Sequence, residues 1–178
     1  MKIFSFLILI IFATGCVKNN SNYTYVPSPK SRLVDEIGKK VFTQLRKERN
    51  LHPCECGGRM MPEITLLHLG FCYYKEIGVE EARELLVAAG ALFLKTINED
   101  ERIRPFLKNY PFTSENIEIR IFLKQSNGTE LGVEKLHVIS LIEGILEYDI
   151  RSLETNRLTT ICKETYEEAT TRLKTISL

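Results

Sequence analysis

Residues 117–151 read IEIRIFLKQSNGTELGVEKLHVISLIEGILEYDIR and determine the fold class. Apolar residues alternate with charged ones from Ile117 to Leu123, which is typical of a half-buried antiparallel strand. Asn127-Gly128 and Glu143-Gly144 are tight-turn signals. They separate a second predicted strand, over 133–142, from a third over 145–151. The side chains that we expect to point inward from these two strands are Leu136, Val138, Ile142, Leu146, Tyr148 and Ile150. Three strands joined by short turns predict a meander.

The preceding hundred residues contain one further strand and the longest predicted helix. Residues 64–74 alternate, with Leu67, Leu69, Phe71 and Tyr73 on one face and His68 and Cys72 on the other. Residues 80–98 carry a broad apolar stripe at helical spacing, wide enough to lie across a sheet. Gly90 inside this helix is unfavourable by roughly 1 kcal/mol relative to Ala, which indicates close packing against a neighbour.

Two more helices are predicted near the ends of the domain. Ser28-Pro29 forms a helix start, and Asn50 is a plausible end. A last helix begins near Thr159, with Cys162, Tyr166, Ala169 and Leu173 on its apolar face and Glu164 and Glu168 on a solvated one. The predicted class is therefore α+β: an antiparallel four-stranded sheet, one strand plus a three-stranded meander, with three helices packed on it.

The first sixteen residues, MKIFSFLILIIFATGC, have the features of an export signal. A basic Lys2 precedes an apolar run that is too short to span a membrane, and small residues stand directly before Cys16. This ending resembles a bacterial lipobox, which implies cleavage before Cys16 and lipid attachment to its thiol. We therefore divide the chain into a signal peptide (1–15), a lipidated flexible tether (16–30) and a single α+β domain (31–178).

The predicted location follows from this anchor. The lipid would hold the protein on a membrane of the cell envelope, with the domain in the periplasm or at the surface. Val17 is not an acidic retention signal, so resemblance to enteric lipoproteins favours the outer membrane in a Gram-negative cell. Removing the signal takes away one basic residue, Lys2, and leaves 23 basic and 23 acidic residues. This balance gives no electrostatic basis for binding nucleic acid.

The segment His52-Pro53-Cys54-Glu55-Cys56-Gly57-Gly58 is predicted to be a loop, because Pro and paired Gly favour turns. One interpretation is a metal site formed by His52, Cys54 and Cys56, since thiolates and imidazole suit zinc or copper. The spacing does not match a zinc ribbon. A second interpretation is a disulfide, because Cys54, Cys56, Cys72 and Cys162 form an even set once Cys16 is lipidated. Four thiols allow three connectivities, and the sequence does not choose among them. A third interpretation is a plain turn whose thiols have no role.

Several short sequence segments in the middle of the chain are similar to those of a known group of proteins. Glu81-Ala82-Arg83, Ile97-Asn98, Arg104-Pro105-Phe106-Leu107 and Tyr110-Pro111-Phe112-Thr113 resemble exported proteins of chlamydia-like intracellular bacteria, over about residues 57–125. The resemblance implies a shared small domain and a host-associated lifestyle. It assigns no activity and no functional residues.

The sequence predicts a non-enzymatic interaction or scaffolding domain of the envelope, with an unidentified protein partner. We assign no catalytic residue, no cofactor and no metal, because no nucleophile, base and orienting group appear together. A pocket that held His137, Asp149 or Glu164 together would argue against this interpretation. The alternative is a small exported metal-binding protein or enzyme that uses His52, Cys54 and Cys56.

Overall fold

The computed structural model describes residues 26–176, so the predicted signal, Cys16 and most of the predicted tether lie outside the described residues. The elements in chain order are helix α1 (Pro29–Arg49), strands β1 (His52–Arg59) and β2 (Leu66–Tyr73), helix α2 (Val79–Glu99), the short 3-10 helices η1 (Arg104–Phe106) and η2 (Ser114–Asn116), strands β3 (Ile117–Leu123), β4 (Leu136–Ile142), β5 (Ile145–Arg151) and β6 (Leu158–Thr165), and helix α3 (Tyr166–Ile176).

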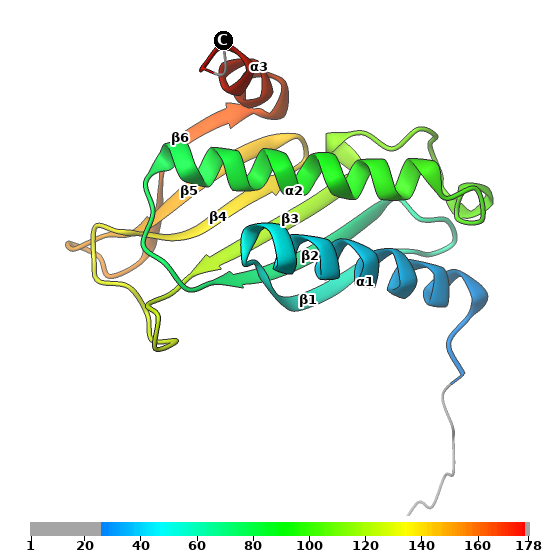
Figure 1. Cartoon of the computed structure of the whole chain (residues 1–178), viewed down its shortest axis with the longest axis horizontal. Coiled ribbons are helices and arrows are strands. Elements are labelled where there is room, and N and C mark those ends of the chain that lie inside the picture. Colours follow the sequence, from blue (N-terminus) through cyan, green and yellow to red (C-terminus); the bar gives the residue numbers. More distant parts are fainter. Residues whose placement is uncertain (1–25, 177–178) are drawn as a thin grey trace, which may run out of the picture.

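The six strands form one mixed sheet in which strand order follows chain order, from β1 to β6 (Figure 1). Every neighbouring pair is antiparallel except β2 and β3, which are parallel. Parallel neighbours need a crossover, and α2 provides it. The predicted antiparallel four-stranded sheet is therefore wrong, because it lacks two strands and the parallel pair. The broader α+β class stands.

The first additional strand is β1, which replaces the loop predicted for residues 52–58. Its residues pair with β2 along its whole length, with one bulge between Pro53 and Glu55. Gly58 allows this approach, because a Cβ there would lie 2.4 Å from the carbonyl oxygen of Leu66. Gly58, one of the two glycines that suggested a turn, thus serves close backbone contact within the sheet.

The second additional strand is β6, which replaces the first two turns of the helix predicted from Thr159. Thr159, Thr160 and Ile161 are β-branched and favour a strand. Helix α3 begins only at Tyr166. Glu164 therefore lies on a strand and is buried, so its predicted place on a solvated helix face is wrong.

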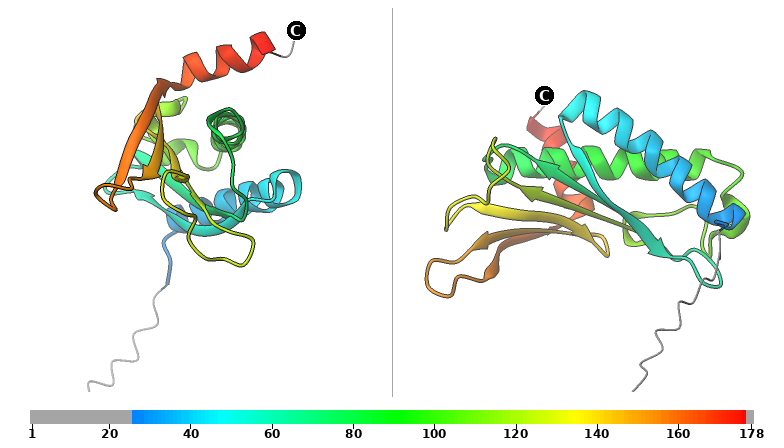
Figure 2. Two further views of the ribbon diagram at one scale, coloured as in Figure 1. Left: turned by 90° about the vertical axis from the view of Figure 1, so that its left-hand side faces the viewer. Right: turned by 90° about the horizontal axis from the view of Figure 1, so that it is seen from below.

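Helices α1 and α2 lie on the same face of the sheet, and α3 packs beside α2 at the β5–β6 end (Figures 1 and 2). The strand β2 face predicted from alternation is confirmed, since Leu67, Leu69, Phe71 and Tyr73 are all buried in the core. The close packing predicted at Gly90 is also confirmed. A Cβ there would lie 2.9 Å from the ring of Tyr166 in α3.

Strand β4 presents different residues to the core from those predicted. Ile139 and Leu141 are completely buried, whereas Val138 and Ile142 are only half-buried. The cause is a bulge between Leu136 and Val138, which adds a residue and reverses the alternation downstream. Val138 and Ile142 consequently lie on the face of the sheet opposite α1 and α2, called here the helix-free face.

Helix α1 has the ends that the sequence predicts. The Ser28 hydroxyl accepts a hydrogen bond from the Ser31 backbone N–H at 3.1 Å, and Pro29 begins the helix. Asn50 ends it in the left-handed conformation, with φ of 55°. Within residues 26–176, no helix combines the length and apolar composition needed to cross a membrane.

Candidate functional site

The helix-free face is hollowed by a pocket of about 340 Å³ at one end of the sheet. All six strands contribute residues to it. The sheet that carries these strands is strongly twisted (Figure 2). The segment between β3 and β4 adds two charged side chains. The lining residues are Cys54, Glu55, Cys72, Phe122, Leu123, Lys124, Glu130, His137, Val138, Arg151 and Leu158.

His137 is held at the pocket wall by contacts at both ring nitrogens. Its Nδ1 lies 3.2 Å from a Glu130 carboxylate oxygen, and its Nε2 lies 3.1 Å from the Gly132 carbonyl oxygen. The same Glu130 oxygen is 3.5 Å from the guanidinium of Arg151. Both ring nitrogens thus contact the segment between β3 and β4, and the residue is 3% exposed. This histidine therefore stabilises that segment against the sheet.

Cys54 and Cys72 lie side by side on the same wall. His52 pairs with Cys72 and Glu55 with Gly70, so the bulge between Pro53 and Glu55 turns Cys54 toward the Cys72 thiol. Both side chains line the pocket. Burial and the neighbouring Cys72 raise the pKa of Cys54 to about 12. Cys54 is therefore a neutral thiol near pH 7, whereas nucleophilic and metal-binding cysteines react as thiolates.

The residues suggested for a metal site do not converge. His52 packs edge-on against the Tyr74 ring, with 5.0 Å between ring centres, and its Nε2 lies 3.2 Å from the Asn50 side-chain oxygen. Cys56 pairs with Leu69 on the helix-covered face, whereas Cys54 lies on the helix-free face. Among residues 26–176, no group of three or more His, Cys, Asp or Glu side chains is arranged to hold a metal ion.

Lys124 is the pocket's cation without a carboxylate partner. Within the part of the chain that the structure describes, no Asp or Glu oxygen lies at ion-pair distance from its ammonium group. The two carboxylates that line the pocket already have partners. Glu55 contacts His68 at 3.0 Å, and Glu130 contacts His137. Beside Lys124, the apolar side chains of Phe122 and Leu158 are open to solvent in part. The pocket thus offers one free positive charge next to an apolar surface.

Glu164 belongs to a separate buried cluster on the helix-covered side. Its Oε1 accepts hydrogen bonds from Arg83 Nε at 2.7 Å and from the Tyr148 hydroxyl at 2.6 Å. Its Oε2 lies 3.6 Å from Arg172 Nε. Burial disfavours the charge of Arg83, but the hydrogen bond and ion pair with Glu164 outweigh it and raise the Arg83 pKa. This cluster ties α2 to β5 and β6.

His137, Asp149 and Glu164 therefore do not share a pocket. Asp149 lies opposite Val138 and accepts a hydrogen bond from the Thr160 hydroxyl at 2.7 Å, on the helix-free face. Glu164 pairs with Leu146 at the other end of the β5–β6 ladder and points to the opposite side. The arrangement that would have argued for an enzyme is absent from the described residues.

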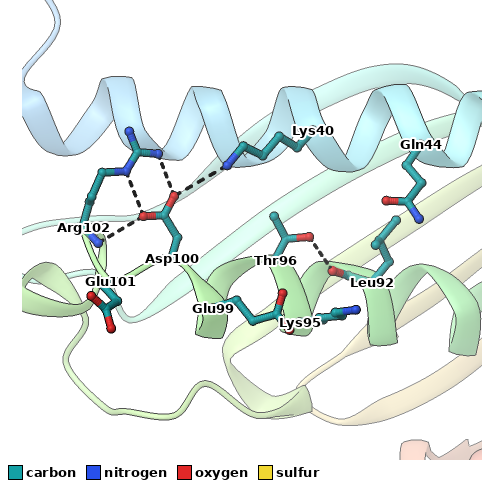
Figure 3. A pocket seen from close by; sticks show the side chains of 9 residues that line it. All are labelled: Lys40, Gln44, Leu92, Lys95, Thr96, Glu99, Asp100, Glu101 and Arg102. Carbon is teal, nitrogen blue, oxygen red and sulfur yellow. Dashed lines mark hydrogen bonds and ion pairs between the residues drawn. The ribbon is translucent and has the colours of Figure 1, made fainter.

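A second hollow, of about 700 Å³, lies between α1 and α2 (Figure 3). Asp100 accepts hydrogen bonds from Arg102 at 3.0 and 2.7 Å, and Lys40 of α1 approaches it to 3.9 Å. The Arg102 hydrogen bonds hold the pKa of Asp100 below its usual value. Arg102 also pairs with Glu36 of α1 at 3.0 Å. These charged groups pair with one another, and their contacts join α1 to the end of α2.

The sequence indicated neither the pocket on the helix-free face nor the Glu164 cluster. Cys54, Cys72 and His137 meet through strand register and two bulges, and Arg83 meets Glu164 across 81 positions. The one available signal was that Cys72 and His68 alternate with the core-facing residues of β2. Comparison of the chain with protein-family models, with curated proteins and with solved structures finds no match.

Proposed function

We propose that this protein is a lipid-anchored, non-enzymatic domain of a bacterial cell envelope that binds a partner protein through the helix-free face of its sheet. The observation that carries the proposal is the pocket on that face, to which all six strands contribute. The three helices pack on the other face or at the sheet's edge. A concave surface with apolar walls and a few polar groups is the usual form of a binding site.

The charge of the pocket favours one kind of occupant, a peptide segment with a carboxylate beside an apolar side chain. Lys124 has no carboxylate of its own in the described chain, so an incoming carboxylate gains an ion pair without breaking another. Phe122 and Leu158 supply the adjoining apolar contact. Apolar anchors flanked by a charged pair are typical of the energetically important part of a protein interface.

The chemistry of the pocket argues against catalysis. A nucleophilic cysteine needs a lowered pKa, whereas the pKa of Cys54 is raised to about 12. A general base needs a free ring nitrogen, whereas both nitrogens of His137 are in contact with Glu130 and Gly132. These features support binding over group transfer.

The anchoring part of the proposal rests on Cys16 and is tested by metabolic labelling. Cells grown with a fatty-acid probe should label the full chain and leave Cys16→Ser unlabelled, because the thiol is the attachment atom. Washed membranes should retain the wild type and release the variant. Label retained by Cys16→Ser, with the protein still expressed at the wild-type level, would refute lipidation at this residue.

The binding part is tested by placing a photoreactive amino acid at position 122, inside the pocket, and at position 47, on the exposed surface of α1. We expect a covalent adduct in cells from position 122 alone. Adding Lys124→Glu should lower its yield roughly tenfold, since a like charge then faces the partner's carboxylate. Lys47→Glu is the matched control and should leave the yield unchanged.

Three results would contradict this proposal: equal adducts from positions 47 and 122, no adduct from position 122, or an adduct that is insensitive to Lys124→Glu. The Cys16→Ser chain provides a further comparison. If it is released from the membrane and still forms the adduct, anchoring and binding are separable properties of the protein.

A further inference from the structure

We infer that Cys54 and Cys72 form a cross-strand disulfide, installed by exchange with a disulfide compound. This assigns a covalent modification site to the edge of the sheet and selects one pair among the four domain cysteines. The inference rests on strand register and on the pocket that both side chains line, and it is independent of which partner that pocket binds.

The geometry brings these two sulfur atoms together. Cys72 is the residue of β2 that pairs with His52, and Cys54 follows two residues later at the bulge of β1. Both line the same pocket, and the side chain of Cys72 is near enough to that of Cys54 to raise its pKa. Directly opposite residues of antiparallel strands lie within the Cα range that a disulfide requires. Cys72 is directly opposite His52, so Cys54 approaches it diagonally, at the bulge of β1.

The other two cysteines are placed away from this pair and from each other. Cys56 points to the helix-covered side, where its sulfur would lie 3.2 Å from a Cβ at Gly38 of α1. Cys162 is on β6, opposite Tyr148 and packed against the core at the other end of the sheet. Neither has another cysteine beside it among residues 26–176.

The reaction balances with one disulfide as the oxidant. One protein thiol loses its proton to water, and the thiolate attacks a sulfur of the oxidant, so one S–S bond forms as another breaks and one thiol is released. The second protein thiol then loses its proton and displaces the remaining half of the oxidant. Two thiols of the protein are oxidised, and the oxidant leaves as two thiols.

The disulfide would join β1, an edge strand, to β2 next to its bulge. That ladder is interrupted between Pro53 and Glu55, so a covalent bond there compensates for missing backbone pairing. Two neighbouring thiols suit this role better than metal binding, which requires thiolates and more ligands than the pair supplies.

The test uses the full chain carrying Cys16→Ser in detergent, which leaves four thiols. After equilibration with oxidised and reduced glutathione, free thiols are blocked with a maleimide and the chain is mapped by mass spectrometry. We expect the thiol count to fall from four to two, with one linked peptide joining Cys54 to Cys72. Adding Cys56→Ser should leave the linkage intact. Adding Cys72→Ser should abolish it.

Three outcomes would overturn the inference: a linked peptide that includes Cys56 or Cys162, glutathione held on Cys54 while Cys72 stays free, or four free thiols under fully oxidised glutathione. The peptide map of the Cys16→Ser chain decides without the further variants. Circular dichroism of each variant verifies that the sheet has formed, so that loss of the linkage cannot be mistaken for loss of the fold.

Discussion

Replacing Arg83 with methionine is expected to lower the free energy of unfolding by about 3–5 kcal/mol. The side chains of Arg83 and Glu164 are 3% and 4% exposed, so the substitution leaves a buried carboxylate without its main partner. The Tyr148 hydroxyl and Arg172, at 3.6 Å, replace only part of the lost interaction. The measurement is urea unfolding followed by circular dichroism, since the chain contains no tryptophan.

Two further variants show whether charge burial is the cause. Combining Arg83→Met with Glu164→Leu and Tyr148→Phe removes both charges and the hydroxyl, and should recover most of the loss, because apolar replacements of buried ion pairs are often neutral. Lys163→Met is the matched control, since Lys163 pairs with Glu147 on the exposed side of the same ladder. Its effect should stay within about 1 kcal/mol. Equal losses in Arg83→Met and Lys163→Met would contradict the explanation.

Replacing Phe71 with alanine should destabilise the domain by about 3–5 kcal/mol. Phe71 is fully buried on β2 and meets the Phe42 ring of α1 edge-on, with 5.3 Å between ring centres and 79° between planes. The substitution removes apolar burial and this aromatic contact, and leaves a cavity between the sheet and α1. Urea unfolding of the variant and the wild type measures the difference.

Phe122→Ala is the matched control for Phe71→Ala and separates stability from binding. Phe122 lies on the neighbouring strand β3, opposite Cys72, and faces the pocket on the helix-free side. We expect it to lose less stability than Phe71→Ala, because its side chain is only half-buried. It should instead reduce partner capture by a photoreactive group at position 158. Similar losses of stability in both variants would show that the helix-free face is also part of the core.

The sequence predicted the long periodic elements well. Helix α2 spans Val79–Glu99 against a prediction of 80–98, and α1 has the predicted cap residues Ser28 and Asn50. Helical periodicity over several turns carries enough apolar positions to identify the buried face. The parallel pair was missed although its signal was present. A strand, a 21-residue helix and another strand in succession form a crossover unit, which makes the two strands parallel.

The sequence-based prediction was wrong for short strands and at β-bulges. Gly57 and Gly58 are typical of a turn, yet both lie within β1, and Gly58 allows close contact with β2. Cys162 and Tyr166 matched a helical spacing by chance, because Cys162 belongs to β6 and Tyr166 to α3. The bulge before Val138 moved that residue out of the core. Local sequence does not reveal a bulge, because a residue is extra only relative to the strand with which it pairs.

The candidate site was not predictable for the same physical reason. Cys54 contacts Cys72 because one residue is inserted in β1, and His137 reaches the pocket because one is inserted in β4. Shifting either ladder by one residue would turn these side chains to the other face. The proposed lipid attachment at Cys16 is the opposite case. This proposal rests on the sequence alone, because Cys16 lies outside the described residues.

The chain-ordered sheet has a consequence for biosynthesis. Each strand pairs with the one made just before it. When a strand emerges from the ribosome, the strand that it pairs with has therefore already been made. Most segments that connect consecutive strands are short, and the link between β4 and β5 is only Glu143 and Gly144. The exception is the β2–β3 ladder, which must wait for α2 and the two short helices. We expect this closure to be the slow step, with the β4–β5 hairpin forming early.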